Sequence, residues 1–340
     1  MKNIFSFKYD ELVTFLLSID EKKYRAKQIY EWLYLHKIWT YEAMSNLSKE
    51  LVNKLNQQIS TELIKIKAKE TDPEVIKYLF ALNDDNYIEA VLMKHDYGNS
   101  LCISSQVGCN MGCTFCESGR LKKVRDLLVH EMVGQVLLVE TDLKERIDSV
   151  VIMGIGEPFD NYDNVMNFIR IINHPFGLAI GARHITISTC GIIPKIDAFA
   201  EEALQVNLAV SLHGATDSVR RELMPVSKVY PIKDLIDCLR RYIAKTNRRI
   251  TIEYVMLMDI NDSELAAVEL TNLIKGLNVY VNLIPYNETS HLDYKKSNDE
   301  RIRAFAETLK KAKIDVTIRK AFGRNIAAAC GQLRAKEVEK

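Results

Sequence analysis

From Leu101 onward, short apolar segments alternate with amphipathic helical patterns, and this alternation constrains the fold more than any other feature. The apolar segments have the length and β-branched content of strands, and the intervening segments repeat apolar residues at helical spacing. Such alternation is typical of βαβ units that form a parallel sheet. About six units are too few for a closed eight-unit barrel, which predicts an α/β fold with an open, partial (β/α)6 barrel. Strands are expected at 101–105, 148–153, 184–189, 206–211, 250–257, 279–285 and 314–319, and helices at 130–143, 162–172, 193–203, 231–245, 262–275 and 298–312.

The segment before Leu101 predicts a different organisation. Leu12, Phe15 and Leu16 repeat at helical spacing, which indicates an amphipathic helix. Two β-rich runs at 75–82 and 87–93 flank Asn83-Asp84-Asp85-Asn86, which favours a hairpin. The chain is therefore expected to comprise an N-terminal helical RNA-binding accessory domain (1–62), a β-hairpin extension or linker (63–96) and the partial barrel (97–340).

Composition places the chain among soluble globular proteins, with 47% hydrophobic and 27% charged residues. No apolar run reaches the ~18 residues of a membrane span, and the N-terminus lacks the pattern of a signal peptide, so a cytoplasmic location is expected. The net charge of +1 does not by itself indicate nucleic-acid binding. Basic residues nevertheless form four groups, which taken singly are usually solvated helix faces: Lys22, Lys23, Arg25 and Lys27; Arg120, Lys122, Lys123 and Arg125; Arg220, Arg221 and Lys228; Arg240, Arg241 and Lys245.

Three of the seven cysteines, Cys109, Cys113 and Cys116, lie within eight residues in a C-x3-C-x2-C pattern after an expected strand. Clustered cysteines in a cytosolic chain indicate metal binding or catalysis. Three thiolates on one loop can ligate a [4Fe–4S] cluster and leave its fourth iron open for another ligand.

A zinc site is the alternative for these cysteines. Zinc needs a fourth ligand, which His95 or Cys102 could supply, and it is usually held by two C-x2-C pairs. The spacing, together with Phe115 before the last cysteine, favours the cluster. A zinc-stabilised RNA-binding module without catalysis remains the non-enzymatic interpretation.

The same motif resembles that of the radical S-adenosylmethionine (SAM) superfamily, in which the open iron chelates SAM. Nearly the whole chain is similar to the 23S rRNA adenine methyltransferases, a family with an adenine-C2 branch (RlmN) and an antibiotic-resistance branch that methylates C8 (Cfr). The N-terminal YRAKQIYEWLY is similar to the accessory domain of that family. The other similar segments, in order, are LCISSQVGCNMGCTFC, MGIGEPFDN, ITISTCGIIP, AVSLHGA, RELMPVSKVYPI, IEYVMLMDINDS, VNLIPYN and IRKAFGRNIAAACGQL.

The resemblance implies how an adenine carbon, which is not a nucleophile, becomes methylated. One SAM methylates a protein cysteine, and the cluster reduces a second SAM to a radical that activates this methyl group, so two SAM are used per turnover. The resemblance assigns the S-methylcysteine to Cys330 and the proton acceptor to Glu89. It assigns the resolving thiol, which ends in a disulfide with Cys330, to Cys102. From the residues alone, each of the three would more often be a packing or solvated side chain.

A SAM site is indicated first by Gly156 and Glu157, which follow an apolar strand in Gly154-Ile155-Gly156-Glu157-Pro158. Glycine permits close backbone approach to a ligand, and a carboxylate can accept a hydrogen bond from an ammonium. Such ligands bind at the carboxyl ends of parallel strands. Cys190 and Cys238 have no counterpart in the family and are interpreted as core residues. By resemblance, the SAM contacts are Gly156, Glu157, Ser188, Ser211, Leu212, His213 and Asn287.

The implied substrate is an adenosine in 23S rRNA, and some relatives also methylate a tRNA, which requires extruding the base. The implied partners are these RNAs and an electron donor such as flavodoxin or ferredoxin. The enzyme is expected to be a monomer that does not bind a membrane. MGIGEPFDN and IRKAFG are closer to the C2 branch, whereas CISSQ and the Phe322-Gly323 pair favour C8 methylation. A third interpretation is a related enzyme that acts on another RNA or on a peptide.

The sequence departs from the usual family pattern at several positions. Glu117 stands where a small residue is more common, and Asp126 stands where asparagine is common. Before Cys330, the usual acidic residues are replaced by Arg324, Asn325 and Ala327. None of these departures removes a residue assigned to the chemistry, but they leave open which substrate is used and which position is methylated.

Overall fold

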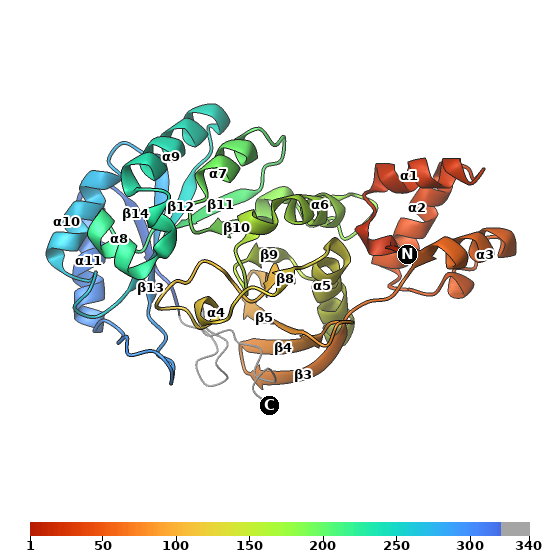
Figure 1. Cartoon of the computed structure of the whole chain (residues 1–340), viewed down its shortest axis with the longest axis horizontal. Helices are drawn as coiled ribbons and strands as arrows, with labels where there is room; N and C mark the ends of the chain where they lie inside the picture. Colours follow the sequence, from red (N-terminus) through yellow and green to blue (C-terminus); the bar gives the residue numbers. More distant parts are fainter. Residues whose placement is uncertain (321–340) are drawn as a thin grey trace.

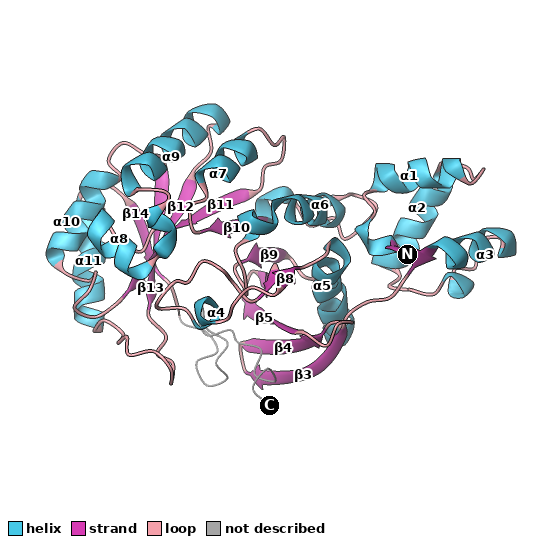
Figure 2. Ribbon diagram, viewed as in Figure 1, coloured by secondary structure: helices cyan, strands magenta, loops and turns pink. Residues whose placement is uncertain are grey.

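The computed structural model describes residues 1–320, and its central feature is a ten-stranded sheet in the order β14-β13-β12-β11-β10-β9-β6-β5-β4-β3 (Figures 1 and 2). From β6 to β14 all neighbouring strands are parallel, as the alternation predicts. Within residues 1–320 the edge strands β14 and β3 do not pair, so the sheet forms an open barrel. The parallel strands are β6 (Gly98–Ile103), β9 (Ser149–Ile152), β10 (Ile185–Thr189), β11 (Asn207–Ser211), β12 (Ile250–Met256), β13 (Val279–Pro285) and β14 (Asp315–Ile318).

The long helices cover the outer face of the parallel strands (Figure 2). Their positions agree with the expected helices, and the apolar stripe is clearest in α6 (Tyr162–Asn173), α9 (Ile232–Thr246) and α11 (Asp299–Lys311). None of the helices in residues 1–320 is long and apolar enough to cross a membrane. The covering helices are α5 (Val129–Leu143), α6, α7 (Ile193–Ala200), α9, α10 (Glu264–Leu273) and α11, and two unexpected short helices are α4 (Glu117–Arg120) and α8 (Asp217–Leu223).

The parallel strands carry different residues on their two faces. Outward-facing side chains such as Ile187, Val210 and Ile252 are buried in the hydrophobic core beneath the helices. Strand register places Ser211 beside Glu253, and Glu253 beside Asn282, so these polar residues share the inner face. The barrel interior therefore contains polar side chains beside apolar ones, whereas the outer face is held by apolar packing.

The hairpin extends the main sheet. Strands β4 (Val75–Ala81) and β5 (Tyr87–His95) are antiparallel, and β5 pairs with β6 of the barrel. A further strand, β3 (Lys65–Asp72), pairs with β4 and forms the edge. Its mostly exposed sequence KIKAKETD carries many charges, which oppose pairing with another chain at this edge.

The N-terminal helices lie at one end of the molecule, beside α6 (Figure 1). The Tyr9 ring stacks on His174 with centroids 4.5 Å apart and meets Phe176 edge-on at 5.3 Å. Trp32 packs against the core, and its Nε1 donates to Asn46 Oδ1 at 2.7 Å. The helices are α1 (Tyr9–Ser18), α2 (Tyr24–Tyr30), which continues as a π-helical turn (Glu31–Leu35), and α3 (Lys49–Gln58), with short strands β1 (Lys2–Asn3) and β2 (Ile59–Ser60) pairing beside them.

Candidate active site

A cavity lies at the carboxyl ends of the parallel strands, and it brings together most of the residues expected at the site. Ligands bind at this end of such sheets because the loops there carry the variable side chains. Glu253, Ile284 and Arg319 also line it, although the sequence did not single them out. The expected residues that line the cavity are Cys109, Cys113, Cys116, Gly156, Glu157, Ser188, Ser211 and His213.

The three cysteines of the C-x3-C-x2-C motif lie on a tight loop between β6 and α4. Gly108 and Gly112 have φ values of +74° and +64°, which favour glycine. A Cβ at Gly108 would lie 2.1 Å from the carbonyl oxygen of Lys122, so no side chain fits there. Tight packing of the loop on residues that follow it therefore holds the three thiols at the cavity.

Burial raises the pKa of all three thiols. The pKa of Cys109 is raised to about 12, first by burial and then by neighbouring acidic groups, and the pKa values of Cys113 and Cys116 are raised for the same first reason. As bare thiols the three would therefore hold their protons at neutral pH. A bound iron would replace those protons, because cysteine ligates metals as the thiolate.

The donor set fits a cluster better than a single zinc ion. Within residues 1–320, no three Cys, His, Asp or Glu side chains are grouped closely enough to hold one metal ion. A structural zinc site would need four ligands around one ion, whereas a [4Fe–4S] cluster spreads its thiolates over separate irons. Three soft sulfur donors that line one cavity are the arrangement an iron–sulfur cluster requires.

Glu157 is buried, and backbone groups hold its carboxylate in place. Its Oε1 accepts from the Phe159 N–H at 2.9 Å, and its Oε2 accepts from the Cys190 N–H at 2.7 Å. Burial raises the pKa of Glu157, and the two backbone hydrogen bonds oppose that effect by stabilising the charged form. The carboxylate is thus preoriented at the cavity, where a ligand ammonium could pair with it.

The glycines before Glu157 lie at the cavity and also pack closely against the segment 103–106. A Cβ at Gly154 would lie 2.7 Å from the backbone of Ile103, and one at Gly156 would lie 2.6 Å from the Gln106 side chain. These glycines therefore allow neighbouring segments of the protein to approach one another.

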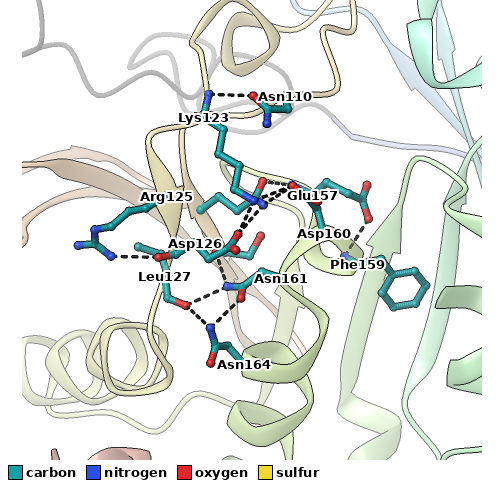
Figure 3. Close-up of polar contacts among 12 residues, drawn as sticks. Asn110, Lys123, Arg125, Asp126, Leu127, Glu157, Phe159, Asp160, Asn161 and Asn164 are labelled. Atoms are coloured by element: carbon teal, nitrogen blue, oxygen red, sulfur yellow. Dashed lines mark hydrogen bonds and ion pairs between the residues drawn. The ribbon is translucent and has the colours of Figure 1, made fainter. Parts of the chain in front are cut away.

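Gln106, which the sequence did not single out, connects the cysteine loop to the Glu157 segment. Its Oε1 accepts from the Glu157 N–H at 2.9 Å, and its Nε2 donates to Asp126 at 2.8 Å and to Asp160 at 2.9 Å. Figure 3 shows Lys123 between the same two carboxylates, 2.8 Å from each. Asp126, one of the departures from the family pattern, thus ties the segment after the cysteines to the site.

These contacts change the interpretation of the basic group at 120–125. Lys123 is neutralised by Asp126 and Asp160, and the Arg125 guanidinium forms two 2.8 Å hydrogen bonds with Glu131. Both side chains hold the loop in place, whereas Lys122 is exposed.

Glu117, the other departure within the described residues, is buried at the start of α4 next to Cys116. Its Oε2 lies 3.4 Å from Arg120 Nη1, whereas its Oε1 has no hydrogen-bond partner within residues 1–320. The remaining departures, Arg324, Asn325 and Ala327, lie outside the described residues.

His213 faces the cavity in a fixed, neutral state. Its φ of +55° turns the chain after β11, and its Nδ1 accepts from the Val255 N–H at 3.1 Å. Burial first, and then Arg220, lower the pKa of His213 to about 3. Because Nδ1 accepts a hydrogen bond, we assign the single ring proton of the neutral form to Nε2, which leaves an N–H donor.

Glu253 and Asn282 form a polar pair on the inner face. Asn282 Nδ2 donates to a Glu253 carboxylate oxygen at 3.0 Å, and burial raises the pKa of Glu253. The sequence carried a signal for this pair: parallel strands buried on both faces read as continuous apolar runs, whereas β12 and β13 alternate polar and apolar residues. Alternation in a parallel strand indicates an interior that faces a ligand.

The other expected site residues do not line the cavity formed by residues 1–320. Leu212 is fully buried in the core, and Asn287 is buried after β13. Cys102 on β6 and Glu89 on β5 lie on the inner face, and Glu89 is buried with Lys77 Nζ 3.7 Å from its Oε1. Cys330 lies outside the described residues.

Arg220, expected in a basic surface group, is in fact fully buried on α8. Its Nη2 donates to the carbonyl oxygen of Cys190 at 2.6 Å. Cys190, interpreted as a core residue, is buried but also lines the cavity, whereas Cys238 packs in the core.

Comparisons with known proteins give consistent matches over the whole chain. Residues 103–270 match the model of the radical SAM superfamily, and residues 2–60 match that of the ribosomal RNA large subunit methyltransferase N-terminal domain. The chain is 49% identical over 336 residues to a probable dual-specificity RNA methyltransferase RlmN of Acholeplasma laidlawii, covering 98% of this chain and 99% of that protein. A Spiroplasma citri protein of the same name is 49% identical over 340 residues, 99% of this chain and 98% of its own. The crystal structure of a radical SAM methyltransferase from Sphaerobacter thermophilus is 39% identical, with a TM-score of 0.94 over 98% of this chain and 100% of that chain.

Proposed function

Because the chain belongs to the RlmN family of radical SAM RNA methyltransferases, we propose that it methylates C2 of an adenosine in 23S rRNA, with a tRNA adenosine as a second substrate. The observation that carries this proposal is the convergence of three cysteines, Glu157 and His213 on one cavity at the carboxyl ends of the strands. The second substrate rests on the dual specificity in the names of the relatives.

Cys109, Cys113 and Cys116 would hold a [4Fe–4S] cluster whose open iron takes SAM. Bound there, the cluster and SAM supply a carbon-centred radical able to remove hydrogen from a methyl group. The Glu157 carboxylate would accept from the SAM ammonium, and the His213 Nε2–H would donate to an acceptor on the same ligand. Ser188 and Ser211 offer hydroxyls along the same edge of the sheet.

Three further residues would complete the transfer. Cys330 would carry the methyl group, whose carbon becomes joined to the adenine carbon after losing one hydrogen atom to the SAM-derived radical. The adduct would then give up one electron, which the oxidised cluster can take, and Glu89 would accept the proton released from the adenine carbon. The Cys102 thiolate would then attack the Cys330 sulfur, forming a disulfide as the sulfur–carbon bond breaks and the carbon takes up a proton. Cys102 and Glu89 share the inner face of the sheet, which supports a joint role.

RNA would approach across the N-terminal helices. Lys22 and Lys23 are exposed there, and Tyr24 is half-exposed, so this end offers charges for phosphates and a ring for stacking. We propose that residues 1–62 form an RNA-binding accessory domain, and that a flavodoxin or ferredoxin supplies the electron.

The first test is anaerobic purification followed by reaction with SAM, a reductant and rRNA or tRNA. We expect iron and sulfide in the protein and 2-methyladenosine in the digested RNA by mass spectrometry. Stoichiometric zinc without iron would contradict the cluster. If 8-methyladenosine appears instead, the C8 alternative replaces the C2 assignment, and if neither nucleoside appears, the substrate is another RNA or a peptide.

The second test separates the two cysteine roles. Cys330→Ala should abolish methylation, because the methyl carrier is lost. Cys102→Ala should leave a covalent protein–RNA species that migrates slowly on a denaturing gel. Cys238→Ala is the control, since Cys238 is buried in the core, and it should turn over. Normal turnover by Cys102→Ala would refute the resolving role.

A further inference from the structure

Lys77 on β4 is a buried lysine that contacts carboxylates on both neighbouring strands. Its side chain is only 4% exposed, and lysine is almost never buried to this degree without a partner. Its Nζ lies 2.9 Å from Glu70 Oε1 on β3 and 3.7 Å from Glu89 Oε1 on β5. Glu70 is half-exposed, whereas Glu89 is as buried as the lysine. One ammonium group thus links a surface carboxylate to a buried one.

The strand register builds this arrangement. Lys77 stands opposite Glu70 on one side and opposite Val91 on the other. Val91 in turn stands opposite Cys102, and Glu89 precedes Val91 by two residues on the same strand. Opposed residues of antiparallel strands point to the same face, as do residues two apart. Lys77 therefore shares the inner face of the barrel with Glu89 and Cys102.

The surroundings of Glu89 would by themselves oppose a charge. Its carbonyl oxygen accepts from Ser104 Oγ at 2.6 Å, which fixes the backbone, and the same face carries buried apolar side chains such as Val75 and Val91. Burial among apolar groups favours the neutral carboxylic acid, whereas a nearby cation favours the carboxylate. Within residues 1–320, Lys77 supplies that cation. By register, the other ionisable side chains on this face of β3 to β6 are Lys65, Glu70, Asp72, Tyr87, His95 and Cys102.

We propose that Lys77 is a positioning residue that keeps Glu89 ionised on the inner face, ready to accept the proton released from the adenine carbon. This inference rests on the proposed role of Glu89 in the methyl transfer. When Glu89 takes up the proton, Lys77 keeps Glu70 as its partner, so no buried cation is left unpaired. The inner carboxylate can therefore change its charge in each turnover while the outer one does not.

The test measures the protonation of Glu89 directly, by infrared difference spectroscopy of the anaerobically purified enzyme during a pH titration. The carboxylic acid band that is lost in Glu89→Gln identifies this residue. Lys77→Met should raise the midpoint of its titration by about one to three pH units, and Lys77→Arg, which keeps the charge, should stay near the wild-type midpoint. Lys69→Met is the matched control. Lys69 on β3 also pairs with a carboxylate at 2.9 Å, that of Asp142, but on the outer face, so this variant should leave the midpoint unchanged.

Methylation provides the second measurement. Methylation by Lys77→Met should fall at neutral pH and recover as the pH rises, because Glu89 then ionises without its cation. An unchanged midpoint in Lys77→Met would overturn the inference, and so would a loss of methylation that higher pH does not restore. Full methylation by Glu89→Gln would instead contradict the proposed role of Glu89. Where Lys77→Met does not fold, Lys77→Gln decides, since it keeps a hydrogen-bond donor without the charge: a raised midpoint supports the inference, and an unchanged one overturns it.

Discussion

At the scale of single residues, backbone geometry assigns the chemistry that residue type alone left open. The His213 side chain is neutral because its backbone, in the left-handed conformation after β11, places the ring in a buried position that lowers its pKa. In this position its Nδ1 accepts from the Val255 N–H. The sequence predicted that His213 belongs to the site, yet its protonation state depends on burial by segments far away in the chain. The same holds for Arg220, which looks like a surface residue in the sequence.

The depressed pKa of His213 predicts acid sensitivity. The folded value is about 3 and the unfolded value is about 6.5, so below pH 6.5 the unfolded chain binds a proton that the folded one does not. At pH 5 this difference in proton binding lowers the free energy of unfolding of the wild type by about 2 kcal/mol. The His213→Asn variant lacks the titrating group and should not show this loss. Urea unfolding at pH 7 and pH 5 measures the difference. Exposed His184→Asn is the control, and equal pH dependence in wild type and His213→Asn would refute the prediction.

Gly154 provides a second prediction at this scale. Gly154→Ala should destabilise the fold by about 1–3 kcal/mol, because the added methyl meets the Ile103 backbone and not a movable side chain. Gly181→Ala, where the nearest atom belongs to the His184 side chain at 3.2 Å, should change stability by less. Thermal unfolding of both variants tests the order, and equal losses would contradict it.

At the scale of elements, the sequence predicted the long helices and parallel strands because their periodic patterns span several turns or residue pairs. It missed α4 and α8, which are too short to show a period, and β3, whose charged sequence KIKAKETD does not read as a strand. It predicted the cysteine loop and the Glu157 segment as separate features. Their connection through Gln106 depends on contacts between residues about fifty positions apart, such as Gln106 with Glu157.

Gln106 should therefore matter for both stability and ligand binding. Gln106→Met removes three hydrogen bonds of about 1 kcal/mol each and releases the Glu157 segment. We expect a loss of about 2–3 kcal/mol in stability and about tenfold weaker SAM binding by calorimetry.

Gln135→Met is the matched control for Gln106→Met. Gln135 is also fully buried, and its amide bonds to the backbone of Ser104 at 2.9 and 3.0 Å. This variant should lose stability without a specific loss of SAM affinity. If both variants bind SAM equally, the proposed link from Gln106 to the ligand is wrong.

At the scale of the whole molecule, the site and the N-terminal helices lie apart and are joined by packing. Tyr9 docks these helices on His174 and Phe176 beside α6, so they form part of one body with the barrel. Topology, which no local pattern specifies, also brings Glu253 of β12 and Arg319, which follows β14, to the cavity. The alternation in β12 places Glu253 on the inner face, whereas nothing in the sequence places Arg319 at the cavity.

Charge reversal at the N-terminal end should weaken RNA binding. The double variant Lys22→Glu, Lys23→Glu removes two exposed cations, so RNA affinity should fall and the slope of log affinity against log salt should decrease by about 1–2. Lys310→Glu with Lys311→Glu, on α11 at the opposite end, is the control (Figure 1). Equal slopes in wild type and the N-terminal variant would show that RNA binds elsewhere.

The alternation along the parallel strands gives packing and chemistry to different residues of the same strand. Outward positions such as Ile252 and Val281 hold the helices, whereas inward positions such as Glu253 and Asn282 contribute little to that packing. Mutations can therefore change the inward-facing side chains one at a time, while the outward-facing side chains keep the protein able to fold. A scaffold of this kind can diversify its chemistry over evolutionary time without passing through unfolded intermediates.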